Sequence, residues 1–255
     1  MPGRDLLLVA HGSDRFIDAG APVEAHAAAL RATGLFGRVA VALLAGGPPP
    51  AEILASCPGP RVDVVPFFME AGWFTAVAVP RALQLDGQVP PERSVRIVEP
   101  VGTHPALAAV IAARVARHAP EARRLLLIGH GSARRPGRRL ALHDHADRLA
   151  SLFERVEVAL LEEPPFVPDA LARLRGAPVA TLGLFLGAGG HVREDVPALL
   201  AAAAADGALR DCGTIAEEPG LRSIVLDRVG LATDRVAGVP LEWPAGTPNT
   251  RRMEE

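Results

Sequence analysis

The sequence predicts an α/β protein of two tandem halves, each built on a parallel β-sheet, with a cleft between them. Three observations predict this class. Apolar, β-branched runs of strand length alternate with helical stretches, which is the pattern of βαβ units. The whole pattern begins a second time near Arg124. Histidines and carboxylates follow directly after three apolar runs, at the strand ends where parallel sheets build ligand sites.

The first half divides into strands and helices in chain order. DLLLVAHGS is expected to form a strand that ends in a polar turn, and Gly34 takes the C-cap position of the helix that begins near Pro22. Prolines open the next, short helix, because proline is tolerated in a first helical turn. The remaining expected elements are strands at 38–47 and 94–100, a strand followed by a loop at 61–72, and helices at 48–56, 75–85 and 105–119.

Four segments of the second half match segments of the first in the same order. LLLVAHGS is matched by LLLIGHGS, and RVAVALLAGGPPP by RVEVALLEEPPF. FFMEAGWFTAVAVPRAL is matched by FLGAGGHVREDVPALL, and GTHPALAAVIAARV by AEEPGLRSIVLDRV. The chain is therefore expected to hold one repeat at 4–120 and a second at 121–235. A tail at 242–255, rich in Pro, Gly, Thr and charge, is expected to be disordered.

The two repeats differ at the positions that could carry chemistry. Glu162 and His191 stand where the first repeat has Ala45 and Phe74, and only the HGS turn is common to both. We therefore expect His130, Glu162 and His191 to meet at one site in the second repeat. Two histidines and a carboxylate at such a site can hold a metal ion or take up protons.

A second difference concerns the walls of the expected cleft. The first repeat offers flat apolar surface in Trp73 and Phe74, and its HGS turn continues into the acidic DRFIDAGAPVE. The second continues into ARRPGRR, in which Arg134 and Arg135 follow Ser132. Guanidinium groups bind carboxylates in a planar fork, so this segment suits a substrate with several carboxylates.

Each of these features also has a purely structural interpretation. His130 could cap the following helix, and His191 could sit in a flexible glycine loop. Glu162 and Glu163 could be surface charges at a strand end, and the arginines could form a solvated loop. Asp195 precedes Val-Pro at the start of an expected helix, and we favour a capping role for it over metal ligation.

Composition excludes several classes of function. A net charge of -2 argues against general nucleic-acid binding. Two cysteines make neither a disulfide framework nor a CxxC metal site, which fits a reduced, cytoplasmic setting. The apolar runs are too short for a signal peptide or a membrane span. A serine nucleophile is disfavoured because no GxSxG elbow occurs.

These motifs together resemble the class II tetrapyrrole chelatases, the sirohydrochlorin cobaltochelatases and ferrochelatases, in their long two-repeat form. The resemblance runs from Asp5 to Val236 and rests on HGS, the LE-P segment, GGHVREDVP and GTHP in that order. Its most specific part is FLGAGGHVREDVP combined with the upstream HGS. It implies two flavodoxin-like halves that face a central cleft, with Gly189 and Gly190 beside the substrate.

The resemblance also implies an activity, that of a metal chelatase of the lyase class. Such an enzyme inserts Co²⁺ or Fe²⁺ into the anionic tetrapyrrole sirohydrochlorin, on the route to cobalamin or siroheme. The metal is then a substrate, and no permanently bound cofactor is expected. His130 and His191 would bind the metal and take up the pyrrole protons, assisted by Glu162. Many members carry the complete set in the N-terminal half, whereas here that half keeps only His11.

The chemistry required of such a site matches these residue types. Insertion removes two N–H protons from the macrocycle while a hydrated ion sheds water, and neutral imidazole can both ligate a borderline cation and accept a proton. The main alternative is a tetrapyrrole or metal carrier without turnover, and a metal-dependent hydrolase is a weaker one. The sequence leaves open whether cobalt, iron or nickel is used, which pathway is served, whether His11 contributes, and whether the protein is a monomer or a homodimer.

Overall fold

The computed structural model describes residues 3–85, 93–203 and 209–231. The chain divides into two compact units, each assembled from more than one segment of the sequence. Unit 1 comprises Met1–His104, Leu186–Gly189 and Pro219–Ala237, and unit 2 comprises Pro105–Phe185, Gly190–Glu218 and Gly238–Glu255. The tail expected at 242–255 lies outside the described residues.

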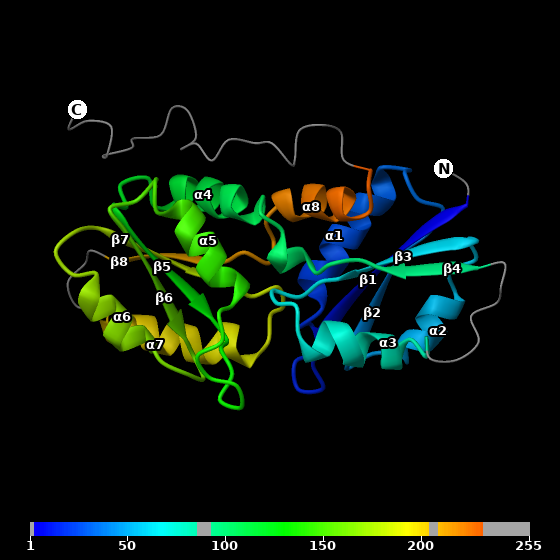
Figure 1. Cartoon of the computed structure of the whole chain (residues 1–255), viewed down its shortest axis with the longest axis horizontal. Coiled ribbons are helices and arrows are strands. Elements are labelled where there is room, and N and C mark those ends of the chain that lie inside the picture. The colour runs from blue at the N-terminus through cyan, green and yellow to red at the C-terminus, as the bar shows by residue number, and fades with distance from the viewer. Residues whose placement is uncertain (1–2, 86–92, 204–208, 232–255) are drawn as a thin grey trace. The chain divides into compact units, whose positions relative to one another are not determined.

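Unit 1 is a parallel four-stranded sheet with the strand order β2-β1-β3-β4. Helices α1 and α8 cover one face of the sheet, and α2 and α3 cover the other (Figure 1). The elements are β1 Arg4–Gly12, α1 Ala21–Ala32, β2 Val39–Ala45, α2 Pro50–Ala55, β3 Arg61–Pro66, η1 Phe74–Ala78, α3 Val79–Ala82, β4 Ser94–Ile97, η2 Val101–Thr103 and α8 Gly220–Arg228.

Unit 2 repeats this arrangement in the order β6-β5-β7-β8, again with every pair parallel. Helices α4 and α5 lie on one face, and α6 and α7 lie on the other (Figure 1). The elements are α4 Leu107–His118, β5 Arg124–Gly129, α5 Ala141–Leu149, β6 Arg155–Leu160, α6 Val167–Arg173, β7 Val179–Gly183, η3 His191–Asp195, α7 Val196–Ala203 and β8 Leu209–Thr214. The predicted α/β class with two parallel sheets is confirmed.

The central strands form because their side chains are apolar on both faces. Leu6, Leu7 and Leu8 on β1 are fully buried, as are Leu125 and Leu126 on β5. A strand between two helical layers must be apolar throughout, and burying each leucine contributes about 1.5–3 kcal/mol. Burial of these apolar side chains therefore places β1 and β5 in the interior of their sheets.

The two repeats exchange their last helices between the compact units. Helix α4 belongs to the first repeat by sequence but packs in unit 2, against α5 and β8. Helix α8 ends the second repeat and packs in unit 1, against α1 and η2. The division at 120/121 that the repeat suggests along the sequence therefore differs from the division into compact units.

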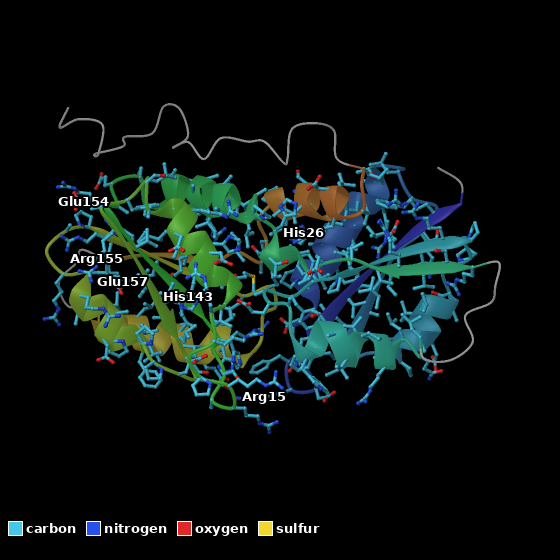
Figure 2. All side chains as sticks on the ribbon, in the orientation of Figure 1. Arg15, His26, His143, Glu154, Arg155 and Glu157 are labelled. Atoms are coloured by element: carbon cyan, nitrogen blue, oxygen red, sulfur yellow. The ribbon has the colours of Figure 1, made fainter. Side chains whose placement is uncertain are left out.

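Charged side chains at the start of β6 form a structural cluster at the amino-terminal edge of the second sheet. Figure 2 shows Glu154, Arg155 and Glu157 together at that edge. Glu157 pairs with Arg155 at 2.6 Å and with Arg173 at 3.1 Å. These charges neutralise one another, at the edge opposite to the end of β5 where the HGS turn begins.

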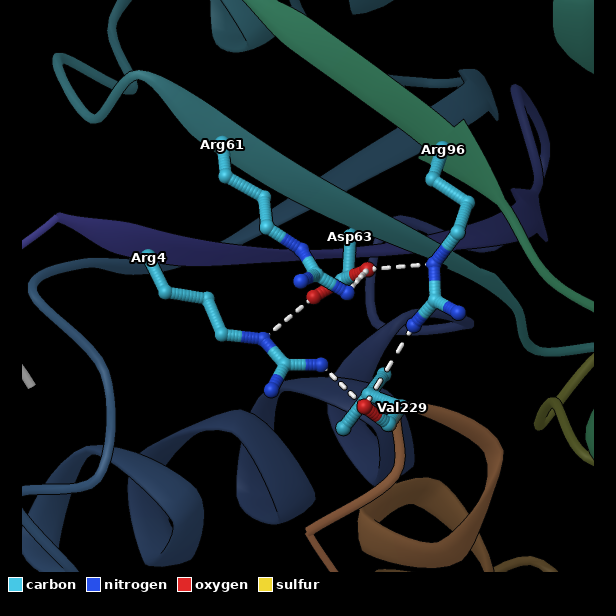
Figure 3. Close-up of polar contacts among 5 residues, drawn as sticks. All are labelled: Arg4, Arg61, Asp63, Arg96 and Val229. Atoms are coloured by element: carbon cyan, nitrogen blue, oxygen red, sulfur yellow. Dashed lines mark hydrogen bonds and ion pairs between the residues drawn. The ribbon is translucent and has the colours of Figure 1, made fainter.

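A buried carboxylate anchors helix α8 in unit 1. Asp63 on β3 is fully buried and pairs with Arg4, with Arg61 at 3.4 Å and with Arg96 at 2.8 Å (Figure 3). Arg4 and Arg96 also donate hydrogen bonds to the backbone carbonyl of Val229, just after α8 (Figure 3). Cations at a helix C-terminus satisfy its free carbonyls, so this end of α8 is tied to β1 and β4.

Among the described residues no helix is long and apolar enough to cross a membrane.

Candidate metal site

The carboxyl-terminal ends of three strands of unit 2 deliver the side chains of the site. His130 follows β5, Glu162 follows β6, and His191 opens η3 after the loop that leaves β7. Strand pairing continues past the formal strand ends, because the backbone N–H groups of Leu161 and Glu162 donate to the carbonyl of His130 at 3.1 and 3.0 Å. In the strand order β6-β5-β7-β8, the chain leaves β5 and β6 on one side and continues at β7 on the other, so the topological switch point lies between β5 and β7. Open α/β sheets bind ligands at this point.

The three side chains lie close enough to share one ion. Ligand atoms of His130, Glu162 and His191 are all within 4.8 Å of one another. The imidazole centroids are 4.5 Å apart with an interplanar angle of 86°, and His130 Nδ1 is 3.7 Å from Glu162 Oε2. The rings and the carboxylate are partly exposed, so an ion and a second ligand can reach them. This is a two-imidazole, one-carboxylate set with open positions, which suits a borderline divalent cation.

Hydrogen bonds show which nitrogen of each imidazole ring carries the proton. His191 Nδ1 lies 2.6 Å from Asp195 Oδ2, and His130 Nδ1 lies 3.1 Å from the carbonyl oxygen of Gly131. An ionised carboxylate and a carbonyl accept hydrogen bonds but cannot donate them, so each Nδ1 carries the proton. Each neutral ring then has its lone pair on Nε2, the nitrogen available to a metal ion or to an incoming proton.

Three structural interpretations of these residues prove wrong. His130 caps no helix, because α5 begins only at Ala141. His191 is the first residue of the π-helical turn η3 rather than part of a loop. Asp195 does not cap α7, because η3 runs into that helix without a break and its carboxylate binds His191 instead.

The neighbouring carboxylates Glu162 and Glu163 have opposite environments. The side chain of Glu162 is 40 % exposed, whereas Glu163 is buried with 3 % exposure. Glu163 accepts hydrogen bonds from the backbone N–H groups of Ser132 at 2.8 Å and Gly137 at 2.6 Å. It therefore holds the arginine-bearing loop after β5 against the end of β6. The alternative interpretation of Glu163 as a surface charge is therefore wrong, and the only signal in the sequence was its position beside Glu162.

The expected substrate-binding residues Ser132, Arg134, Arg135, Gly189 and Gly190 lie in the segments that follow β5 and precede η3. Arg134 and Arg135 are exposed, and the backbone N–H of Arg135 donates to the Ser132 carbonyl at 3.1 Å. Gly190 is the N-cap of η3, with the ordinary helical φ of -56°. A Cβ added to Gly189, which belongs to unit 1, would meet no described atom within 4 Å. The backbone conformation therefore does not require glycine at Gly190.

Other charged and polar groups near the loop are occupied elsewhere. Arg139 pairs with Asp147 at 2.5 Å and Asp144 at 2.7 Å on α5, and these hydrogen bonds raise the pKa of its guanidinium. His143, labelled in Figure 2, accepts a hydrogen bond from the Leu140 N–H through Nδ1 at 3.1 Å. On β8, burial raises the pKa of the Cys212 thiol to about 12, so this thiol is protonated at neutral pH.

The first repeat has the same backbone at this edge but different side chains. Its π-helical turn η1, Phe74–Ala78, has the place of η3, and Phe74 packs against His11 with centroids 4.9 Å apart at 63°. Alanine stands at positions 45 and 78, where the second repeat has Glu162 and Asp195. Within the described residues, the only cluster of three or more metal-binding side chains is therefore the one in unit 2.

The aromatic residues expected to line a binding surface lie at this edge of unit 1. Trp73 is 56 % exposed and Phe74 is 42 % exposed. Their rings meet edge to face with centroids 5.3 Å apart, and Phe68 stacks on Phe74 at 6.0 Å. These exposed aromatic rings, which support one another, form an apolar surface beside His11, but Trp73 and Phe74 are nearly perpendicular, so the surface is not flat as expected.

Known proteins with similar sequences are chelatases or chelatase-like. A probable sirohydrochlorin cobaltochelatase of Halobacterium salinarum is 28 % identical in an alignment of 218 positions, and the match covers 75 % of this chain and 75 % of that one. A solved CbiX structure, described as the terminal enzyme for siroheme biosynthesis in denitrifying bacteria, is 29 % identical with a TM-score of 0.64. The match covers 90 % of this chain and 100 % of that one.

A multi-domain protein of Deinococcus radiodurans, described as structurally similar to chelatases, is 27 % identical with a TM-score of 0.77. The match covers 93 % of this chain but 57 % of that protein's length, which includes two additional domains. The family model of CbiX matches residues 5–118 and again residues 124–232, one match for each repeat. Because two copies of that model account for both halves, the chain is a two-repeat member of the CbiX family.

Proposed function

We propose that this protein inserts a divalent metal ion, Co²⁺ or Fe²⁺, into sirohydrochlorin. The observation that carries the proposal is the cluster of His130, Glu162 and His191, with ligand atoms within 4.8 Å of one another, in a chain of the CbiX family. The names of its relatives, a probable cobaltochelatase and an enzyme of siroheme biosynthesis, support this substrate and leave both metals in the proposal.

The ion enters as a substrate and is held by the cluster. Because each Nδ1 is hydrogen-bonded, the Nε2 atoms of His130 and His191 replace two waters of the hydrated ion, and the Glu162 carboxylate contributes charge and a third ligand atom. Two neutral ligands and one anion leave a divalent ion with a net positive charge of about one. Such an ion is held strongly enough to be oriented and weakly enough to be passed on to a ring of four nitrogens.

The same side chains accept the protons that the macrocycle releases. Two pyrrole N–H bonds break as the metal–nitrogen bonds form, and each proton needs an acceptor within hydrogen-bond reach. Each Nε2 lone pair is released as its bond to the ion breaks, and it then takes up one of the two protons, so that ligand exchange and proton transfer proceed together. No electron is transferred, so the site needs no redox centre and no nucleophile.

The loop after β5 supplies positive charge for the acidic side chains of the substrate. Arg134 and Arg135 are exposed on this loop, which Glu163 holds beside the cluster. Guanidinium groups bind carboxylates as planar, bidentate pairs. We infer that these two arginines hold the macrocycle by its carboxylates, with Ser132 and the glycines before His191 at its margin.

The test is an anaerobic absorbance assay with sirohydrochlorin and either Co²⁺ or Fe²⁺, measured against the reaction without enzyme. We expect turnover above that background with at least one metal. His191→Ala should abolish turnover, whereas His11→Ala should only weaken it, because the first repeat has Phe74 and Ala45 at the positions that match His191 and Glu162. Equal loss in both variants would contradict a single site in unit 2. A spectral change that stops at one equivalent would indicate a carrier.

A further inference from the structure

We propose that Asp195 is a positioning residue, which fixes the ring of His191 and selects Nε2 as its metal-binding atom. The identity of the ion as a chelatase substrate rests on the proposed function above, but the hydrogen bond itself does not. Asp195 ends the π-helical turn that His191 begins, and its Oδ2 lies 2.6 Å from His191 Nδ1. Asp195 contacts Nδ1 of His191, whereas the proposed metal ligand is Nε2 on the other side of the ring, so Asp195 need not touch the metal.

The geometry determines which nitrogen is free. A neutral imidazole carries one N–H and one lone pair, and in water the proton exchanges between the two nitrogens. The Asp195 carboxylate can only accept a hydrogen bond, so it keeps the proton on Nδ1 and the lone pair on Nε2. It also restricts rotation of the ring about its bonds, because only one orientation brings Nδ1 to Oδ2.

Comparison of the two repeats shows that an aspartate at this position is not required for the turn to fold. The turn η1 in the first repeat has the same π-helical form as η3, yet it carries Phe74 and Ala78 where η3 carries His191 and Asp195. A carboxylate is therefore not needed to build the turn. The histidine and the aspartate occur together in the second repeat and are both absent from the first, as expected if one serves the other.

The other histidine shows why Asp195 is the informative position. His130 Nδ1 is held by the carbonyl oxygen of Gly131 at 3.1 Å, a backbone group that no side-chain substitution removes. His191 receives the equivalent support from a side chain. Side chains that orient a metal-binding histidine typically affect metal affinity or activity by ~10- to 100-fold when removed.

The experiment compares Asp195→Ala, Asp195→Asn and the control Glu194→Gln with the unaltered protein. Glu194 lies in the same turn, so its substitution removes a neighbouring negative charge without touching the His191–Asp195 hydrogen bond. Two quantities are measured for each. One is the protonation of the His191 ring nitrogens in the metal-free protein, read from ¹⁵N chemical shifts. The other is Co²⁺ affinity, read from visible absorbance without tetrapyrrole.

We expect Asp195→Ala to move the His191 proton toward Nε2 and to weaken Co²⁺ binding by ~10- to 100-fold. Asp195→Asn should lie closer to the unaltered protein, because the amide oxygen can still accept from Nδ1–H. Glu194→Gln should leave the ring protonation unchanged and alter Co²⁺ affinity less than ~3-fold, the effect of an exposed charge.

An unchanged proton distribution in Asp195→Ala would overturn the proposal, and so would equal losses of Co²⁺ affinity in Asp195→Ala and Glu194→Gln. The ring protonation is measured without metal or tetrapyrrole. It therefore tests Asp195 even if the unaltered protein shows no turnover, a result that would count against the proposed function alone.

Discussion

Single residues of the site divide their work according to burial. Glu162 and Glu163 are adjacent, yet the first projects into the cluster with His130 and the second is enclosed under the loop after β5. A partly exposed carboxylate keeps much of its hydration and can exchange water for a metal ion. A buried one needs its hydrogen bonds to remain stable, and Glu163 obtains them from two backbone N–H groups.

Substitution of each glutamate by glutamine should therefore give opposite results. Glu163→Gln replaces one accepting oxygen with an NH₂ group that faces a backbone N–H, so we expect a loss of about 1–3 kcal/mol in the free energy of unfolding. It should also raise KM for the tetrapyrrole more than it weakens Co²⁺ binding, because the arginine loop loses its support. Glu162→Gln should change stability by less than about 0.5 kcal/mol and weaken Co²⁺ binding.

Chemical denaturation and Co²⁺ titration of the two variants check this division. Hydrogen exchange at the amides of Ser132 and Gly137 gives a local measure, since these two groups donate to Glu163. Similar losses of stability in both variants, or unchanged exchange in Glu163→Gln, would count against the assignment.

The sequence could predict which three side chains meet, but not the residues that hold them in place. Strand ends and residue types are local properties, and they predicted that His130, Glu162 and His191 would meet. The roles of Asp195 and Glu163 depend on where helix η3 begins and on which way a loop folds. Neither is visible in residue spacing alone, so a cap was favoured for Asp195 and no supporting role was predicted for Glu163.

At the scale of the element, the π-helical turns η1 and η3 have the same backbone hydrogen bonding but carry different side chains. In both, the residue after the turn, Val79 or Val196, donates its N–H to the carbonyl five positions earlier. A proline follows at position 80 or 197, and because it has no N–H it cannot make the usual bond four positions back. The helix expected at 75–85 therefore begins as a wide turn, a feature often found at functional sites.

Because the backbone is shared, the first repeat should regain a metal site when its side chains are restored. The substitutions Ala45→Glu, Phe74→His and Ala78→Asp would reproduce the side chains of the second repeat around His11. The ring centroids of His11 and Phe74 are already 4.9 Å apart. We expect the unaltered protein to bind one Co²⁺ per chain and the triple variant to bind two. Isothermal titration with the metal alone measures both.

Addition of His11→Ala to the triple variant provides the control and should return the stoichiometry to one. Addition of His191→Ala to the triple variant should leave only the new site. A triple variant that remains folded and still binds a single Co²⁺ ion would show that the two edges differ in more than these side chains.

At the scale of the whole chain, the exchange of helices could not be predicted from the repeat. The sequence predicted a helix at 105–119 after the strand at 94–100, and it matched AEEPGLRSIVLDRV, which contains α8, to that helical segment. Which sheet a terminal helix covers depends on long-range contacts. For α8 these include the carbonyl of Val229, bound by Arg4 and Arg96 from β1 and β4, and Asp227, bound by His104 at 2.7 Å.

The contact between His104 and Asp227 should make the stability of unit 1 depend on pH. Burial lowers the pKa of His104 from its ordinary value of 6.5, although the hydrogen bond to Asp227 opposes this shift. The unfolded chain therefore binds a proton at a higher pH than the folded one does. The stabilising contribution is complete above about pH 6.5 and is lost as the pH falls from there through the lowered pKa of the folded state.

The variant His104→Gln should remove this pH dependence, because its amide can still donate to Asp227 but cannot gain a proton. We expect the loss of unfolding free energy between pH 7.5 and pH 5 to be smaller in this variant than in the unaltered protein. His118→Gln, at an exposed position on α4, should keep the original dependence. Urea denaturation at the two pH values decides between these outcomes. Parallel losses in all three proteins would mean that protonation of other groups controls how unit 1 responds to acid. If only His104→Gln resists acid, the helix contributed by the second repeat is held in unit 1 by a neutral histidine.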